Sequence, residues 1–195
     1  NNGFQKIEYA DLKSLESYGD YQIQNQSKIR KAGAKNLTKS WQSIPHVSHF
    51  EEADITKIEK QRKEINEISA VKITPLSYII KATSLALEEF PLMNSSLVGD
   101  AKLMIKKYIN IGVAVNTDQG LVVPVIKNAN NLKIGEIAEK ILEISITNSK
   151  ITIDQKEIIE KTILPFSLSY DHRVINGVDA GNFMSFIKDT IEKGL

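Results

Sequence analysis

The chain has 195 residues, of which 42% are hydrophobic and 25% are charged, and its formal net charge is +1. We expect a single soluble globular domain with a proper core. The near-neutral charge argues against a dedicated nucleic-acid surface, which needs clustered excess lysine and arginine. We expect neither a membrane span, which needs roughly 20 apolar residues, nor a signal peptide. The absence of cysteine excludes disulfides, thiolate metal sites and a cysteine nucleophile.

The first 45 residues are predicted to form a polar arm followed by one helix. Residues 1–26 are polar and weakly periodic, so we expect a linker or an arm that lies on a neighbouring molecule. A helix is predicted to begin after Ser27 and to end at Pro45. Its apolar residues recur every four positions on one face, and we expect Trp41 to lie in the core; the face consists of Ile29, Gly33, Leu37 and Trp41.

A strand and two helices are predicted next. Residues 47–52 alternate in the manner of a strand. Asp54 can cap the helix that comes after it. Thr74 and Pro75 have the residue types that open a further helix, with proline at its first position. That last helix is predicted to be largely buried and to end at Pro91.

The rest of the chain is predicted to combine hairpins with helices. Two β-branched strands, over 109–115 and 121–126, are joined by turn residues, and Pro124 places the second strand at an edge or a bulge. An amphipathic helix with Ile134, Ile137, Ile141 and Leu142 comes next, followed by a strand–turn–strand unit over 151–159, a strand over 166–170 and a helix from Gly177. Because no Gly-rich dinucleotide turn accompanies these elements, we predict a mixed α+β fold.

The densest polar cluster of the chain lies between the last predicted strand and the last predicted helix, and it contains Asp171, His172, Arg173, Asn176 and Gly177. An unperturbed imidazole titrates near pH 6.5, so His172 is a candidate general base, and such assistance is typically worth about 10² to 10⁴ in rate. Asn176 can orient a ligand or hold the local backbone, and Gly177 allows a tight turn into the helix. The alternative is a structural histidine that is paired with Asp171 or Arg173.

We predict no metal site. His46 and His49 belong to one predicted strand, where we place them on the same face. No cysteine or paired carboxylate motif supplies a third ligand with suitable geometry. We therefore expect both histidines at the surface or at the rim of a channel.

The run from Ser169 to Gly177 resembles the His-x-x-x-Asp-Gly signature of the dihydrolipoamide acyltransferases, the catalytic cores of 2-oxo acid dehydrogenase complexes. Chloramphenicol acetyltransferase shares that signature. Residues 36–47, 90–97 and 108–125 resemble further stretches of the family in the same order. The resemblance covers residues 27–195 and points to the acetyltransferase of bacterial pyruvate dehydrogenase complexes. It implies a chloramphenicol-acetyltransferase-like two-layer sandwich, with a mixed sheet and flanking helices.

This resemblance implies the transfer of an acyl group, most simply acetyl, between a lipoyl thiol and coenzyme A. His172 would deprotonate the attacking thiol, and Asn176 stands where many relatives have Asp. The flanking Asp171, Arg173 and Gly177 would support them. The family places ligand-facing residues near one further turn, so we predict substrate-binding roles for Asn94, Ser95 and Ser96.

The resemblance also implies partners. Coenzyme A or acetyl-coenzyme A would be a substrate, and the lipoyl group would be carried on a separate domain. The subunits would form a homotrimer, able to assemble into a larger cage with the decarboxylase and dehydrogenase components of the complex. No metal, nucleic acid or membrane is implied. The expected location is the cytoplasm of a bacterium, or the mitochondrial matrix in a eukaryote.

One stretch of the family is not found in these residues. Relatives carry a Phe-Thr-Ile-Ser-Asn/Ser-Leu-Gly strand before the histidine signature, and its serine donates to the oxyanion. Here the chain passes almost directly from the helix at 134–141 to residues 144–150, which resemble the part of the family located after that strand. We therefore predict that one strand segment is lacking after residue 143, through a deletion or a loop left out near 141–145. The oxyanion serine is unknown.

Two alternatives to the acyltransferase remain open. The fold could serve as a non-catalytic structural core or assembly scaffold, because the serine strand is lacking. It could also be a free acetyltransferase like the chloramphenicol enzyme. Acetyl transfer to dihydrolipoamide that depends on His172 separates the first hypothesis from both alternatives.

Overall fold

The computed structural model describes residues 9–117, 120–148 and 161–195, and the chain divides after Pro45 into two compact units. We describe each unit by itself. None of the helices within the described ranges is both long and apolar enough to cross a bilayer.

The first unit contains α1 (Leu12–Leu15), the 3₁₀ turn η1 (Glu16–Tyr18) and α2 (Lys28–Ser43). The predicted start of α2 is confirmed, because the Ser27 hydroxyl accepts a hydrogen bond from the Arg30 amide at 3.3 Å. The expectation that Trp41 lies in the core was wrong for the single chain, since 77% of its surface is exposed. No side chain of α2 is buried. A helical period shows which residues share a face, but it does not show what covers that face.

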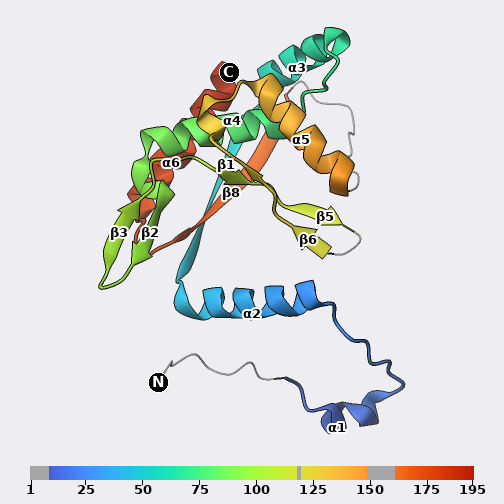
Figure 1. The fold of residues 1–195 in the computed structure, drawn as a ribbon. Helices are drawn as coiled ribbons and strands as arrows, with labels where there is room; N and C mark the ends of the chain where they lie inside the picture. Colours follow the sequence, from blue (N-terminus) through green and yellow to red (C-terminus); the bar gives the residue numbers. More distant parts are fainter. Residues whose placement is uncertain (1–8, 118–119, 149–160) are drawn as a thin grey trace. The chain divides into compact units, whose positions relative to one another are not determined.

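The second unit is built on a ribbon of two long antiparallel strands, β1 (His46–Asp54) and β8 (Ile163–Asp171), which pair from His46 opposite Asp171 to Asp54 opposite Ile163 (Figure 1). Burial alternates along both strands, so each strand has a protected face and an exposed face. His46 and His49 are three residues apart and lie on opposite faces of β1. The prediction of a shared face was therefore wrong.

The helices pack around α4 (Pro75–Glu89), which begins at Thr74 with Pro75 in its first turn, as predicted. One cluster of buried residues joins α4 to α3 (Thr56–Ile68), α6 (Gly177–Lys193) and the ribbon. A second cluster of buried residues joins α4 to α5 (Ile134–Asn148) and to the hairpin over residues 111–126, which we call the central hairpin. The residues of α4 with no exposed surface are small, which lets neighbouring helices approach closely; they are Ser77, Ala82, Ser84 and Ala86. Asp54 accepts a hydrogen bond from the Thr56 amide at 3.0 Å and so assists the start of α3.

The predicted central hairpin is confirmed, with an interruption. The strands β4 (Ile111–Gly112) and β7 (Val125–Ile126) pair with each other, as do β5 (Val115–Thr117) and β6 (Gly120–Val122). Pro124 lies between the two pairings, where a missing backbone N–H is tolerated, and its carbonyl accepts from the Val113 amide at 2.9 Å.

A second hairpin was not predicted. The 3₁₀ turn η2 (Pro91–Asn94) leads into β2 (Ser95–Val98), which pairs with β3 (Lys102–Ile105). The backbone between them has positive φ at Asp100 (23°) and Ala101 (59°). Alanine is an unusual choice for such a position, so the turn carried a weak sequence signal.

The helix α5 runs without a break from Ile134 to Asn148, after the 3₁₀ turn η3 (Ala129–Asn131). Residues 141–145 therefore lie within this helix. The predicted strand–turn–strand unit over 151–159 lies outside the described residues. The fold is α+β, as predicted, and its described strands form antiparallel pairs.

Candidate active site

The candidate base, His172, lies in the short turn between β8 and α6. The carbonyl of Asp171 accepts hydrogen bonds from the amides of Val174 at 3.1 Å and Ile175 at 3.0 Å, which closes the turn. Ile175 is 5% exposed and packs with Tyr170 and Ala180 in a small apolar cluster. The turn is thus anchored on both sides while His172 itself stays at the surface.

The imidazole of His172 is exposed and makes no hydrogen bond or ion pair with the residues that the structure describes. The ring of Tyr170 lies close to it, with 5.9 Å between the centroids and 41° between the planes. The structural alternative, a histidine paired with Asp171 or Arg173, therefore does not hold. An imidazole whose nitrogens are not engaged by the described residues can accept a proton from an incoming ligand.

Asp171 and Arg173 pair with each other instead. The Arg173 guanidinium donates to the Asp171 carboxylate, with Nη2 at 2.6 Å from Oδ2 and Nε at 2.9 Å from Oδ1. These hydrogen bonds are the main reason why the pKa of Asp171 lies below its ordinary value and the pKa of Arg173 above its own.

Asn176 acts as the N-cap of α6. Its side-chain oxygen accepts hydrogen bonds from the amides of Val178 and Asp179, both at 2.9 Å. Asp179 completes a capping box with the Asn176 amide. The Asn-x-x-Asp spacing is the signal that would have identified Asp179 from the sequence. The expectation that Gly177 permits a tight turn was wrong: it is the first helical residue, its φ is not positive, and a Cβ there would meet no atom within 4 Å.

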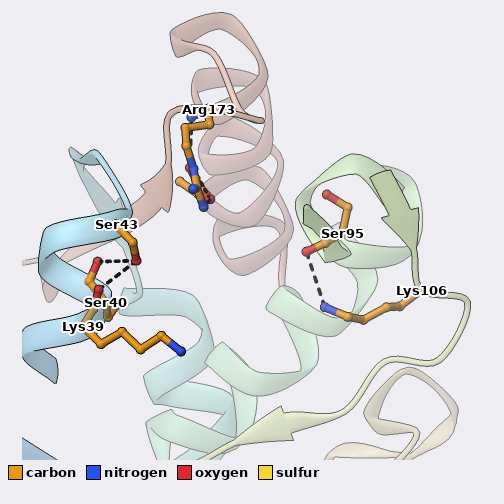
Figure 2. Close-up of polar contacts among 7 residues, drawn as sticks. Lys39, Ser40, Ser43, Ser95, Lys106 and Arg173 are labelled. Carbon is orange, nitrogen blue, oxygen red and sulfur yellow. Dashed lines mark hydrogen bonds and ion pairs between the residues drawn. The ribbon is translucent and has the colours of Figure 1, made fainter. Parts of the chain in front are cut away.

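The predicted substrate residues lie at the start of the second hairpin and are bound internally. The Asn94 amide nitrogen donates to the Tyr108 carbonyl at 2.8 Å. Lys106 was missed by the sequence analysis. Its ammonium group donates to the Ser96 hydroxyl at 2.7 Å and to the Ser95 carbonyl at 3.4 Å, the latter drawn in Figure 2. Since Leu92 and Met93 of η2 pack on the cluster of Tyr170 and Ile175, this segment does adjoin the turn of His172.

No serine is identified as an oxyanion donor. Ser167 and Ser169 lie on the exposed face of β8, and the Ser169 hydroxyl is 2.9 Å from that of Ser48 across the ribbon. The side chain of Ser145 lies outside the described part of the chain. Within the described ranges, no group of three or more His, Asp or Glu residues is placed to hold a metal ion.

A groove of about 610 Å³ lies elsewhere on the ribbon. It contains the ion pair between Lys188 and Glu51, at 3.1 Å, and no histidine; its lining is Phe50, Glu51, Glu52, Pro165, Phe166, Ser167 and Lys188. The groove does not include the turn of His172, so we do not place the chemistry there.

Comparison with known families gives two overlapping matches to one family model, over residues 18–157 and 140–194. The family is described as 2-oxoacid dehydrogenases acyltransferase (catalytic domain). The chain belongs to this family. The resemblance seen in the sequence is thereby confirmed.

Relatives of this acyltransferase domain are components of pyruvate dehydrogenase complexes. The dihydrolipoyllysine-residue acetyltransferase component of Haemophilus influenzae is 38% identical over a match that takes in 87% of this chain and 39% of the relative. The corresponding protein of Buchnera aphidicola from Acyrthosiphon pisum is 35% identical, over 83% of this chain and 54% of its own length. This chain therefore spans about two fifths to one half of the length of these relatives.

Solved structures agree with this family assignment. The dihydrolipoamide acetyltransferase of Azotobacter vinelandii has a TM-score of 0.83 and 29% identity, with 96% of this chain and 97% of that chain covered. That structure belongs to a study of one serine, one histidine and one asparagine in the catalytic mechanism. The histidine and the asparagine are four positions apart, as are His172 and Asn176. The cubic core of a pyruvate dehydrogenase multienzyme complex has a TM-score of 0.82 and 29% identity, with the same coverage. Chloramphenicol acetyltransferase, at 12% identity and a TM-score of 0.54 over 86% of this chain and 99% of that one, shares the fold alone.

The comparisons also reveal a difference in length. The Haemophilus match extends over 222 residues, yet it takes in 87% of the 195 residues here, or about 170. About 50 residues of the aligned stretch therefore have no counterpart in this chain. The two family matches overlap at residues 140–157, which is where a single continuous match is interrupted.

Proposed function

We propose that this domain transfers an acetyl group between coenzyme A and the thiol of a lipoyl group, as the catalytic core of a pyruvate dehydrogenase complex. The observation that carries the proposal is the pair His172 and Asn176. It has the same spacing as the histidine and asparagine studied in the Azotobacter mechanism, and its imidazole is exposed and forms no hydrogen bond with the residues that the structure describes. Coenzyme A and the lipoyl group are substrates here, and the lipoyl group would come from a separate domain.

His172 acts as the general base in this proposal. A free thiol has a pKa of about 8.5, so a neighbouring imidazole needs to give only modest help near neutral pH. The thiol proton moves to an imidazole nitrogen of His172, and the sulfur forms a bond to the thioester carbon, which gives a tetrahedral oxyanion. The oxyanion collapses, the original carbon–sulfur bond breaks, and the departing thiolate takes the proton back from His172.

Asn176 acts indirectly in this proposal. Its side-chain oxygen is occupied by the cap of α6, and an amide cannot serve as a charged base. It therefore holds the turn of His172 on α6. Its amide nitrogen remains able to donate to a ligand.

We infer that the domain is the two-layer sandwich of the family with one strand segment deleted after residue 143. The difference of about 50 residues and the overlap of the two family matches support a deletion. If the lost segment carried the oxyanion donor, turnover is lower by about 10² to 10³. This loss is the reason to keep a second candidate function.

The second candidate is a non-catalytic core or assembly scaffold. Both candidates share a homotrimer that can build a larger cage, together with the decarboxylase and dehydrogenase components of a complex. The cytoplasm of a bacterium, or the mitochondrial matrix in a eukaryote, is the proposed location. The structure of the cubic core among the relatives supports assembly.

The experiment that separates the two candidates uses acetyl-coenzyme A with dihydrolipoamide or chloramphenicol as the acceptor. Release of the coenzyme A thiol is measured together with the acetylated acceptor by mass spectrometry. Transfer to dihydrolipoamide supports the acyltransferase. Trimers without any transfer support the scaffold, and transfer to chloramphenicol alone supports a free acetyltransferase.

A further inference from the structure

The side chain of Asp171 closes a turn around His172. Its Oδ1 accepts a hydrogen bond from the backbone amide of Arg173 at 3.0 Å, so His172 is the middle residue of the closed ring. This is the arrangement of an Asx-turn, in which an Asp or Asn side chain replaces a backbone carbonyl. The carbonyl of the same Asp171 accepts the amides of Val174 and Ile175. One residue thus fixes the backbone on both sides of His172.

The imidazole has no such restraint of its own. It is exposed, the centroid of the Tyr170 ring lies 5.9 Å from its own, and the described residues form no hydrogen bond with it. Its direction therefore depends on the backbone angles of His172 and on its side-chain rotamer, which is coupled to those angles. A change that frees the turn changes where the base points.

The same carboxylate also pairs with the Arg173 side chain, at 2.6 Å between Nη2 and Oδ2. This ion pair is partly exposed, with 38% of the Arg173 side chain and 26% of the Asp171 side chain accessible. Ion pairs of this kind contribute little to stability. The turn and the ion pair are separable: an Asn side chain can close the turn without a charge, whereas a Glu side chain keeps the charge but is too long to close it.

We propose that Asp171 is a positioning residue for His172 and acts through the Asx-turn, not through the ion pair with Arg173. This inference rests on the proposed role of His172 as the general base. A displacement of about 1 Å at a reacting group can cost about 10²-fold in rate. Loss of the turn therefore lowers kcat and leaves KM for acetyl-coenzyme A nearly unchanged.

Three variants test the inference with acetyl-coenzyme A and dihydrolipoamide. We expect Asp171→Glu to lower kcat by about 10- to 100-fold, while Asp171→Asn and Arg173→Gln stay within about threefold of the native domain, because both retain the turn. If Asp171→Asn and Arg173→Gln lose as much activity as Asp171→Glu, the ion pair is what matters and the inference fails. Thermal unfolding of each variant shows that it is folded.

A second measurement does not depend on activity. Hydrogen exchange of the Arg173 amide, followed by NMR, should be slow in the native domain and in Asp171→Asn but at least tenfold faster in Asp171→Glu. Equal exchange in all three proteins overturns the inference even if the enzyme is active. A native domain that transfers no acetyl group overturns the proposed function instead, and the exchange rates then still decide whether Asp171 holds the turn.

Discussion

The side-chain oxygen of Asn176 accepts a hydrogen bond from the backbone amide of Asp179 at 2.9 Å, and the Asp179 carboxylate accepts from the Asn176 amide in return at 3.5 Å. This reciprocal cap starts α6, and the buried Ala180 of that helix packs with Tyr170 and Ile175 on either side of His172. Asn176, four positions after the proposed base His172, therefore has a structural role that the sequence motif does not reveal.

We predict that Asn176→Ala lowers the free energy of unfolding by about 1 kcal/mol, since one N-cap is lost. Asn176→Asp should keep native stability, because Asp and Asn are about equally good N-caps. Chemical denaturation with both variants checks this prediction. Equal destabilisation by Asp and Ala would show that the cap contributes nothing and that the amide nitrogen of Asn176 is what matters.

The ion pair of Asp171 predicts a dependence of stability on pH. The hydrogen bonds from Arg173 hold the pKa of Asp171 below its ordinary value of 3.8 in the folded state. The ionised carboxylate therefore stabilises the fold above about pH 3.8, and this stabilisation is lost as the pH falls through the folded-state pKa.

The variant Asp171→Asn removes this charge and tests the prediction. Because the pair is partly exposed and screened by solvent, we expect the variant to be less stable by about 0.2–1 kcal/mol at pH 7. The difference should shrink toward zero on acidification, and also in about 1 M salt, where the screening length falls to about 3 Å. Unfolding curves at a series of pH values measure it. A difference that grows as the pH is lowered would contradict the assignment.

The packing of α6 on α4 predicts where the domain is most sensitive to mutation. Phe183 is 2% exposed and meets the ring of Phe90 edge-on, with 6.1 Å between centroids. Phe183→Ala should lower the free energy of unfolding by about 3–5 kcal/mol, through lost burial and a cavity. Val178→Ala on the same helix is the control. With 72% of its surface exposed, Val178 should change stability by less than about 0.5 kcal/mol. Similar losses in both variants would mean that this face of α6 is not the core.

The exposed apolar face of α2 predicts association. Leu37 and Trp41 are 72% and 77% exposed in the single chain, and a homotrimer gives such a face something to pack against. We expect the native chain to sediment as a trimer, Trp41→Glu as smaller species, and Lys35→Glu on the same helix as a trimer. A native chain that sediments as a monomer, or a Trp41→Glu trimer as stable as the native one, would contradict this account.

The features that the sequence predicted correctly are those set by local chemistry. Ser27 and the pair Thr74–Pro75 start helices because their residue types satisfy or tolerate unpaired backbone groups at these positions. Pro124 marks the interruption of the central hairpin because it lacks a backbone donor. The place of His172 between a strand and a helix was also predictable from the pattern of the sequence.

The predictions that were wrong or missing concern features that depend on the rest of the fold. The helical period of α2 predicts which residues share a face with Trp41, but it does not predict whether anything covers that face. The hairpin of β2 and β3 was missed because its turn uses Ala101, a residue type that seldom has positive φ. The hydrogen bonds of Asn176 and Asp171 were hidden because the same residue types serve both in catalysis and in turns.

The rate of acetyl transfer from acetyl-coenzyme A to dihydrolipoamide, compared between the native domain and His172→Ala, tests the central claim most directly. His172 is exposed, so the variant should fold with native stability. We predict a rate lower by about 10²- to 10⁴-fold, the usual contribution of a general base. Equal rates in the two proteins, or no transfer by either one, would contradict the assignment of His172 as the base of an acyltransferase.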